Sequence, residues 1–207
     1  MIDRYRRVFP AVGLVGPRQS GKTTLARQVM PRSSGSVVYF DLERQADFGA
    51  TEEVDLFLDG LDQDLVIIDE IQRRPELFVG LRSAIDRNRV EGRFLLLGSA
   101  SPEIIRDSSE SLAGRIGYLE LPPLNLTELG GRFRMNEHWR RGGFPNSLRL
   151  DDSASLLWRD NFIRTYLERD IRTLRPNVDA GILTRMLPML ADVHGRSFWD
   201  WVWVYNV

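Results

Sequence analysis

The sequence predicts an α/β fold in which a parallel β-sheet carries a phosphate-binding loop, followed by a helical appendage. Three observations support this prediction. In the first half of the chain, short apolar runs alternate with amphipathic stretches, which is typical of parallel strands joined by helical crossovers. The segment 16–23 fits a phosphate-loop pattern and lies between an apolar run and a helical stretch. Beyond Pro123 the apolar spacing becomes helical, so we predict two parts, 1–124 and 125–207.

The predicted strands are short and continuously apolar, which indicates that both faces of the sheet are covered. They span residues 11–15, 36–42, 64–70, 93–99 and 118–121. Helical spacing of apolar residues predicts the helices, and Pro31 ends the first of them. They span residues 23–30, 77–87, 155–174 and 179–193. The aromatic stretch 198–205 is interpreted either as a short terminal strand or as the exposed tail of a truncated chain.

Composition and charge exclude several classes of protein. The chain has 207 residues, a net charge of −1, no cysteine and two histidines. A disulfide framework and a thiolate or histidine-rich metal site are therefore excluded. The near-neutral charge argues against a chain that mainly coats nucleic acid, and the apolar runs are too short for a membrane span. Since the amino terminus also lacks the apolar core of a signal peptide, we expect a cytoplasmic protein.

The phosphate loop contains Lys22, which is the only lysine of the chain, whereas the chain has 27 arginines. The position calls for a compact ammonium that reaches the β- and γ-phosphates, where a wider guanidinium would not fit. Backbone N–H groups and the positive end of the following helix converge on the same anion, and the Thr23 hydroxyl offers a ligand to Mg²⁺. The alternative is a chance glycine-rich turn. The predicted nucleotide-binding residues are Gly16, Pro17, Arg18, Gln19, Ser20, Gly21, Lys22, Thr23 and Thr24.

Two adjacent carboxylates, Asp69 and Glu70, end the third predicted strand. Because the carboxyl ends of parallel strands meet at one edge of a sheet, this pair is expected beside the phosphate loop. Asp69 is then placed to hold Mg²⁺, and Glu70 to act as the general base or to orient a water near the γ-phosphate. Adjacent acids are also common at exposed strand ends, so the prediction depends on the loop upstream.

Two further candidates for catalysis are Ser99, at the end of the fourth strand, and Arg115. Ser99 would lie between the metal site and the γ-phosphate, although an ordinary Gly-Ser turn explains it equally well. An arginine that neutralises charge on the γ-phosphate, supplied by the same chain or by a neighbour, assists phosphoryl transfer. On chemistry alone, Arg73, Arg74 and Arg106 are as available as Arg115.

Six motifs taken together resemble the widespread prokaryotic family of predicted AAA+-superfamily ATPases. In that family an AAA-type core precedes a winged-helix segment and a C-terminal domain of uncharacterised function. The resemblance runs from Tyr5 to Gly195. The motifs occupy residues 16–24, 69–78, 94–101, 111–115, 141–145 and 166–171.

The resemblance implies an AAA-like P-loop core with the strand order 5-1-4-3-2, with ATP as the nucleotide and Mg²⁺ as the metal. It favours Ser99 as a sensor and Arg115 as the arginine, through which subunits would associate. From Arg196 onward the sequence departs from the family, so we predict a truncated or frame-shifted chain that contains only the start of the winged helix. Nucleic acid is then not an expected partner of this chain.

The leading hypothesis is an Mg²⁺-dependent ATP hydrolase that uses the loop and the Asp69–Glu70 pair. The alternative is a nucleotide-binding switch or assembly module with negligible turnover in the absence of a partner or of the missing C-terminal domain. A small-molecule kinase shares the loop, but the two carboxylates favour a hydrolytic water. A DNA-binding protein that merely carries the loop is disfavoured by the net charge.

Overall fold

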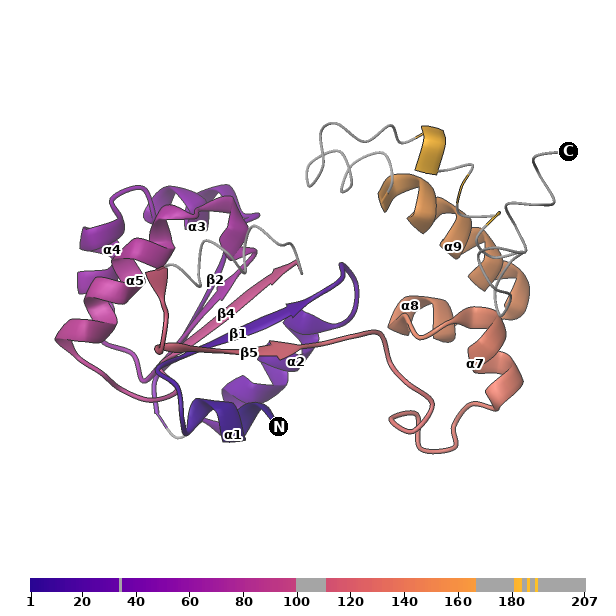
Figure 1. Cartoon of the computed structure of the whole chain (residues 1–207), viewed down its shortest axis with the longest axis horizontal. Helices are drawn as coiled ribbons and strands as arrows, with labels where there is room; N and C mark the ends of the chain where they lie inside the picture. The colour runs from indigo at the N-terminus through magenta and orange to yellow at the C-terminus, as the bar shows by residue number, and fades with distance from the viewer. Residues whose placement is uncertain (34, 100–110, 167–180, 184–185, 187–188, 190–207) are drawn as a thin grey trace, which may run out of the picture. The chain divides into compact units, whose positions relative to one another are not determined.

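A computed structural model of the chain describes residues 1–33, 35–99, 111–166, 181–183, 186 and 189 (Figure 1). Its first part contains a five-stranded parallel β-sheet with the order β2-β3-β4-β1-β5. Read from the other edge, this is 5-1-4-3-2, so the predicted α/β fold class and strand order are confirmed. The strands are β1 (Ala11–Gly16), β2 (Val37–Asp41), β3 (Leu65–Asp69), β4 (Phe94–Ser99) and β5 (Ile116–Glu120).

Helices cover both faces of this sheet (Figure 1). Successive side chains of a strand point to opposite faces. On β3, Leu65 and Ile67 pack with α1 and α2, whereas Val66 and Ile68 pack with α4 and α5. The prediction of a sheet buried on both sides is therefore confirmed for β3, while the edge strand β2 is only half-buried. The helices are α1 (Ile2–Arg6), α2 (Lys22–Val29), α3 (Gln45–Ala50), α4 (Val54–Asp59) and α5 (Glu76–Arg87), with the 3₁₀ turns η1 (Met30–Arg32) and η2 (Ile71–Arg73).

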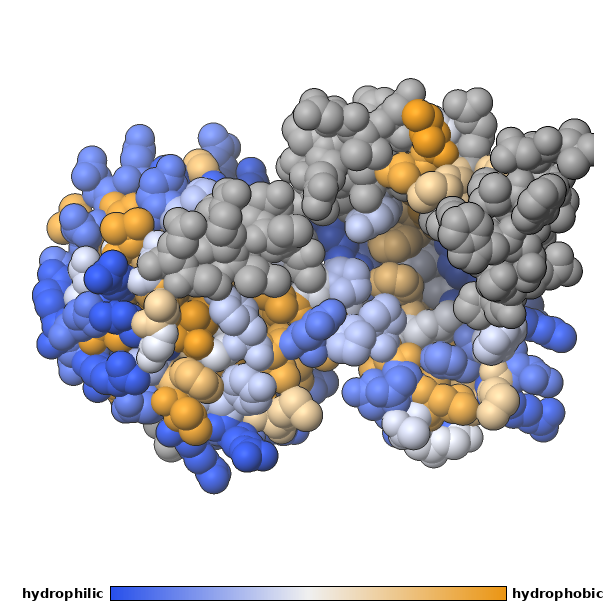
Figure 2. Space-filling model, in the orientation of Figure 1, coloured by the Kyte–Doolittle hydropathy of each residue, from blue (hydrophilic) through white to orange (hydrophobic). Residues whose placement is uncertain are grey.

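The outer surface of α4 and α5 is mostly hydrophilic, as expected for helices that bury their apolar side chains against the sheet. Figure 2 shows a mostly hydrophilic face over α4 and α5, interrupted by isolated apolar side chains. Leu56 and Val79 are exposed apolar residues of these two helices. Scattered apolar residues of this kind are normal on a protein surface and carry no functional argument by themselves.

The helices after the sheet are α7 (Met135–Arg141), α8 (Pro145–Leu148) and α9 (Asp152–Thr165). The chain forms two compact units, Met1–Asn146 and Ser147–Val207. The boundary near residue 124 that separates a nucleotide-binding core from an appendage stays a prediction. At the start of α9, the Asp151 side chain accepts a hydrogen bond from the backbone N–H of Ala154 at 2.8 Å, which fixes the first turn.

Several predicted features lie outside the described residues. They include Arg106, the end of the helix predicted over 155–174, most of the helix predicted over 179–193, and the aromatic stretch 198–205. Within the described part of the chain, no helix is both long enough and apolar enough to cross a membrane.

Candidate functional site

The phosphate loop joins β1 to α2 at the carboxyl-terminal edge of the sheet. Two of its glycines are required by the backbone. A Cβ at Gly16 would overlap the carbonyl oxygen of Leu121, and Gly21 has φ 105°, a conformation that L side chains rarely adopt. Gln19 also lies in the left-handed region, with φ 62°. The loop therefore turns tightly before it opens into α2, as the sequence predicts.

Lys22 is buried, and only 5 % of its surface is exposed. Its ammonium Nζ donates hydrogen bonds to the backbone carbonyls of Gly16, at 3.0 Å, and Pro17, at 2.9 Å. Burial lowers the pKa of Lys22, while the charges of Glu70 and Asp69 act in the opposite direction. The ammonium is thus enclosed by its own loop and lies within the field of both predicted carboxylates.

The remaining loop residues differ in their surroundings. Arg18 forms an ion pair with Glu43 at 3.3 Å. The hydroxyl of Ser20 is buried and has no hydrogen-bond partner among the described residues. Thr24 is exposed on α2. A buried hydroxyl without a partner is unusual in proteins, and in this loop it marks a polar atom that a phosphate oxygen would satisfy.

Asp69 is the last residue of β3 and is nearly inaccessible, with 4 % of its surface exposed. Its Oδ2 accepts hydrogen bonds from the Thr23 hydroxyl at 2.7 Å and from the Tyr39 hydroxyl at 2.6 Å. Its Oδ1 accepts one from the backbone N–H of Glu70 at 3.0 Å. The two residues predicted to hold Mg²⁺ are therefore in direct contact, although their role as metal ligands stays a prediction.

Tyr39, on β2, is a member of this site that the sequence reasoning missed. Burial, followed by the hydrogen bond to Asp69, raises its pKa, so the phenol stays a neutral donor at physiological pH. It fixes the orientation of the Asp69 carboxylate, because that oxygen accepts from Tyr39 and Thr23 together. The sequence signal that could have indicated it is a tyrosine near the end of an apolar strand. In the structure the register of this strand places Asp41 opposite Asp69.

Glu70 directly follows β3 and adopts a left-handed conformation, with φ 55° and ψ 42°. Burial raises the pKa of its carboxyl, and the neighbouring charge of Asp69 adds to this effect. The Gln72 side chain donates a hydrogen bond to Glu70 Oε2, and this contact lowers the pKa in part. A half-buried carboxylate with a raised pKa at the edge that carries the phosphate loop has the properties of a general base.

Ser99 ends β4 and pairs with Gly16 of the phosphate loop. Because β4 lies between β1 and β3, Ser99 stands between the loop and the Asp69–Glu70 pair, and its role as a sensor stays a prediction. The residues that follow, 100–110, lie outside the described part of the chain.

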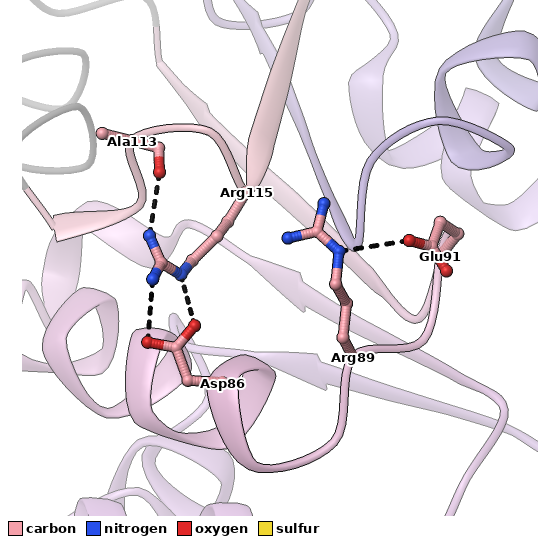
Figure 3. A network of polar contacts seen from close by, with 5 residues as sticks. All are labelled: Asp86, Arg89, Glu91, Ala113 and Arg115. Carbon is pink, nitrogen blue, oxygen red and sulfur yellow. Dashed lines mark hydrogen bonds and ion pairs between the residues drawn. The ribbon is translucent and has the colours of Figure 1, made fainter.

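Arg115 directly precedes β5, which is parallel to β1, so it lies at the edge of the sheet opposite the phosphate loop. Figure 3 shows its side chain directed toward Asp86. Its carbonyl accepts from the backbone N–H of Ala11 at 3.0 Å, at the beginning of β1. The loop begins five residues later, at Gly16, which is roughly 16 Å along the strand. The guanidinium points to Asp86, with Nε–Oδ1 2.6 Å and Nη2–Oδ2 2.8 Å. These hydrogen bonds raise the pKa of Arg115 and lower that of Asp86. Arg115 is therefore not part of the phosphate site of its own chain.

Two other arginines pack against one aromatic ring. The Arg74 guanidinium lies 4.1 Å from the Phe48 ring centroid and donates to the Phe48 carbonyl at 3.2 Å, and that of Arg73 lies 5.5 Å from the same ring. These contacts connect η2 to α3. They indicate a packing role for Arg74 rather than contact with a phosphate.

Comparisons with known proteins agree with this fold. A family model described as an AAA domain matches residues 8–130, and a domain of unknown function, DUF8612, matches residues 132–199. Uncharacterised proteins of Mycobacterium bovis and Mycobacterium tuberculosis are each 43% identical over 201 residues, covering 94% of this chain and 44% of their own. The chain thus spans less than half the length of these relatives. The structure of a Walker-type ATPase of Pyrococcus abyssi matches with a TM-score of 0.56 at 16% identity, over 84% of this chain and 74% of that one.

Proposed function

This chain belongs to the AAA domain family, a group of P-loop ATPases, and we propose that it binds ATP and hydrolyses it with the help of Mg²⁺. One observation carries the proposal. The buried ammonium of Lys22, the contact between Thr23 and Asp69, and the raised pKa of Glu70 all occur at one edge of the sheet. A phosphate loop, a site for a hard cation and a general base are the parts that phosphoanhydride hydrolysis requires.

The loop fits a polyphosphate in four respects. Its glycines allow close approach of the backbone, and the amino end of α2 contributes positive dipole. The Ser20 hydroxyl is a buried donor with no partner among the described residues. Lys22 would exchange its hydrogen bonds to Gly16 and Pro17 for phosphate oxygens, which a point charge on a flexible stem allows.

Thr23 and Asp69 would hold the metal. A hydroxyl and a carboxylate are the oxygen ligands that Mg²⁺ prefers, and Tyr39 keeps the carboxylate oriented. When bound, Mg²⁺ supplies charge neutralisation at the β- and γ-phosphate oxygens. Glu70 would accept a proton from the attacking water, and Ser99, on the intervening strand, would hydrogen-bond either this water or the γ-phosphate.

The test of this proposal is phosphate release from ATP by the purified chain. We expect a slow release of phosphate that requires Mg²⁺. The release should stop when EDTA removes the metal and return when Mg²⁺ is added in excess. The reason is that the metal neutralises negative charge on the phosphate oxygens that the protein alone does not neutralise. A release that EDTA does not affect would contradict the metal site. Tight binding of Mg·ATP without release at any protein concentration would favour the alternative of a nucleotide switch.

The predicted role of Arg115 at the γ-phosphate requires a second copy of the chain. Within one chain it lies at the edge opposite the loop, so it can act on a γ-phosphate only in a second copy. We therefore propose self-association in which Arg115 of one subunit faces the nucleotide of the next. The alternative function, a switch with negligible turnover as a monomer, rests on the same observation.

Replacing Arg115 by Ala is expected to lower phosphate release at high protein concentration by tenfold or more, while Mg·ATP affinity stays unchanged, since an arginine of this kind contributes about 10³- to 10⁵-fold to turnover. The measurement is release per chain over a dilution series, in which the wild-type rate rises with concentration. Arg89→Ala is the control, because Arg89 lies at the same edge and pairs with Glu91 at 3.2 Å (Figure 3). An equal loss at all dilutions would contradict action between subunits.

A further inference from the structure

The side chain of Gln72 lies against the predicted general base. Glu70 adopts a left-handed conformation, and the 3₁₀ turn η2 follows it, with Arg73 N–H donating to the Glu70 carbonyl at 3.0 Å. Ile71 anchors this turn because its side chain is buried in the core. The turn brings Gln72 back over Glu70, and its amide Nε2 donates to Glu70 Oε2.

The other end of the Gln72 carboxamide is unusual. Its Oε1 is buried and accepts no hydrogen bond from any described residue. Buried acceptors in proteins nearly always have a partner, so an orphaned one beside a catalytic carboxylate requires an explanation. Among the described residues, the structure records one side-chain hydrogen bond to the Glu70 carboxylate, at Oε2, so Oε1 of Glu70 remains available to a second donor.

We propose that Gln72 is a further catalytic residue, whose Nε2 fixes the Glu70 carboxylate and whose Oε1 accepts a hydrogen bond from the attacking water. A water molecule carries two protons. One would bond to Glu70 and the other to Gln72, and the two bonds together would define the direction in which the oxygen lone pair points. This inference rests on the proposed hydrolase function and adds to it the means of orienting the water.

The proposed reaction is the hydrolysis of ATP by this water. The water oxygen forms a bond to the γ-phosphorus, and the bond from that phosphorus to the β–γ bridging oxygen breaks. The electron pair of the broken bond stays on ADP, and the proton of the water passes to the Glu70 carboxylate and then to solvent. Gln72 exchanges no proton, because a carboxamide neither gains nor loses one at physiological pH.

Removal of the Gln72 hydrogen bonds is expected to affect turnover and not binding. The water loses one of its two acceptors, so turnover falls while nucleotide affinity does not.

The test compares Gln72→Met with Gln63→Met. Methionine retains the length of the side chain without its hydrogen bonds. Gln63 is a matched control because its Oε1 is also buried without a described partner, yet it precedes β3 at the opposite edge of the sheet. We expect Gln72→Met to lower kcat by about ten- to a hundredfold, a part of what a positioned base contributes. Mg·ATP affinity should remain at the wild-type value, so the loss falls on kcat alone. Gln63→Met should change none of these.

Matching kcat values for the two variants would overturn the inference. If circular dichroism shows that Gln72→Met is unfolded, Gln72→Asn is judged by the same criteria. Asparagine retains the polar carboxamide, but its side chain is one methylene shorter, so the carboxamide does not reach the same position. Wild-type turnover with unaffected Gln72 variants would contradict this inference alone. A wild-type chain that binds Mg·ATP and releases no phosphate would contradict the hydrolase proposal and this inference with it.

Discussion

Glu70→Gln is expected to abolish ATP hydrolysis while Mg·ATP binding survives. Glutamine has the shape of glutamate but cannot accept a proton from water, and a positioned base contributes about 10²- to 10⁴-fold to turnover. Binding should persist because Lys22, Thr23 and Asp69 make the proposed contacts to phosphate and metal. Phosphate release and equilibrium binding of Mg·ATP should be measured on the same preparation. Glu76→Gln is the matched control, since Glu76 is an exposed carboxylate in the first turn of α5.

Loss of activity in Glu70→Gln should not come from unfolding. Burial and the charge of Asp69 raise the pKa of Glu70 in the folded chain. Folding therefore favours the protonated form, and the ionised form costs stability as the pH rises through the folded pKa. A neutral glutamine removes this cost, so at neutral pH the melting temperature of the variant should equal or exceed that of the wild type. Turnover retained by the variant would contradict the role of Glu70 as base.

Strands β1 to β4 could be predicted from the sequence because each is a largely apolar run followed by a turn. Strand β5 (Ile116–Glu120) begins two residues before the predicted range 118–121. For β3 the predicted range, 64–70, exceeds the observed Leu65–Asp69 by one residue at each end. The strand order did not follow from these runs and came from the family resemblance. Five helices were missed, and all have four to seven residues, so they are too short to show a helical period. They are α1, α3, α4, α7 and α8.

Residues of the candidate site that belong to a contiguous motif could be predicted from the sequence. Residues that join the site only through tertiary contacts were missed. The loop and the Asp69–Glu70 pair are both visible as local patterns at the ends of apolar strands. The hydrogen bond from Tyr39 to Asp69 depends on two strands being neighbours in one register. The orphaned acceptor of Gln72 depends on the left-handed conformation of Glu70, which no propensity of glutamate predicts.

Lys22→Ala is expected to weaken Mg·ATP binding by some ten- to a hundredfold, because hydrogen bonds to a charged group contribute about 1.5–3 kcal/mol each. The substitution also leaves the Gly16 and Pro17 carbonyls without the donor that now bridges them. Titration of Mg·ATP and Mg·ADP into both proteins measures the change. Lys22→Met is the control for packing, since it retains the apolar stem in a position that is 5 % exposed. Wild-type affinity in Lys22→Met would contradict phosphate contact by the ammonium.

The composition of the chain allows an independent measurement of the same contact. Lys22 is the only lysine, so acylation by an amine reagent can modify one side chain and the amino terminus. Burial lowers the pKa of Lys22, which increases the fraction of nucleophilic free amine. Mg·ATP should slow acylation of Lys22 because phosphate oxygens would engage and recharge the ammonium. It should leave the exposed amine of Met1 unaffected, which provides an internal standard in the same mass spectrum. If Lys22 is acylated in the free chain, an equal rate with Mg·ATP present, in a chain shown to bind it, would place the nucleotide away from the loop.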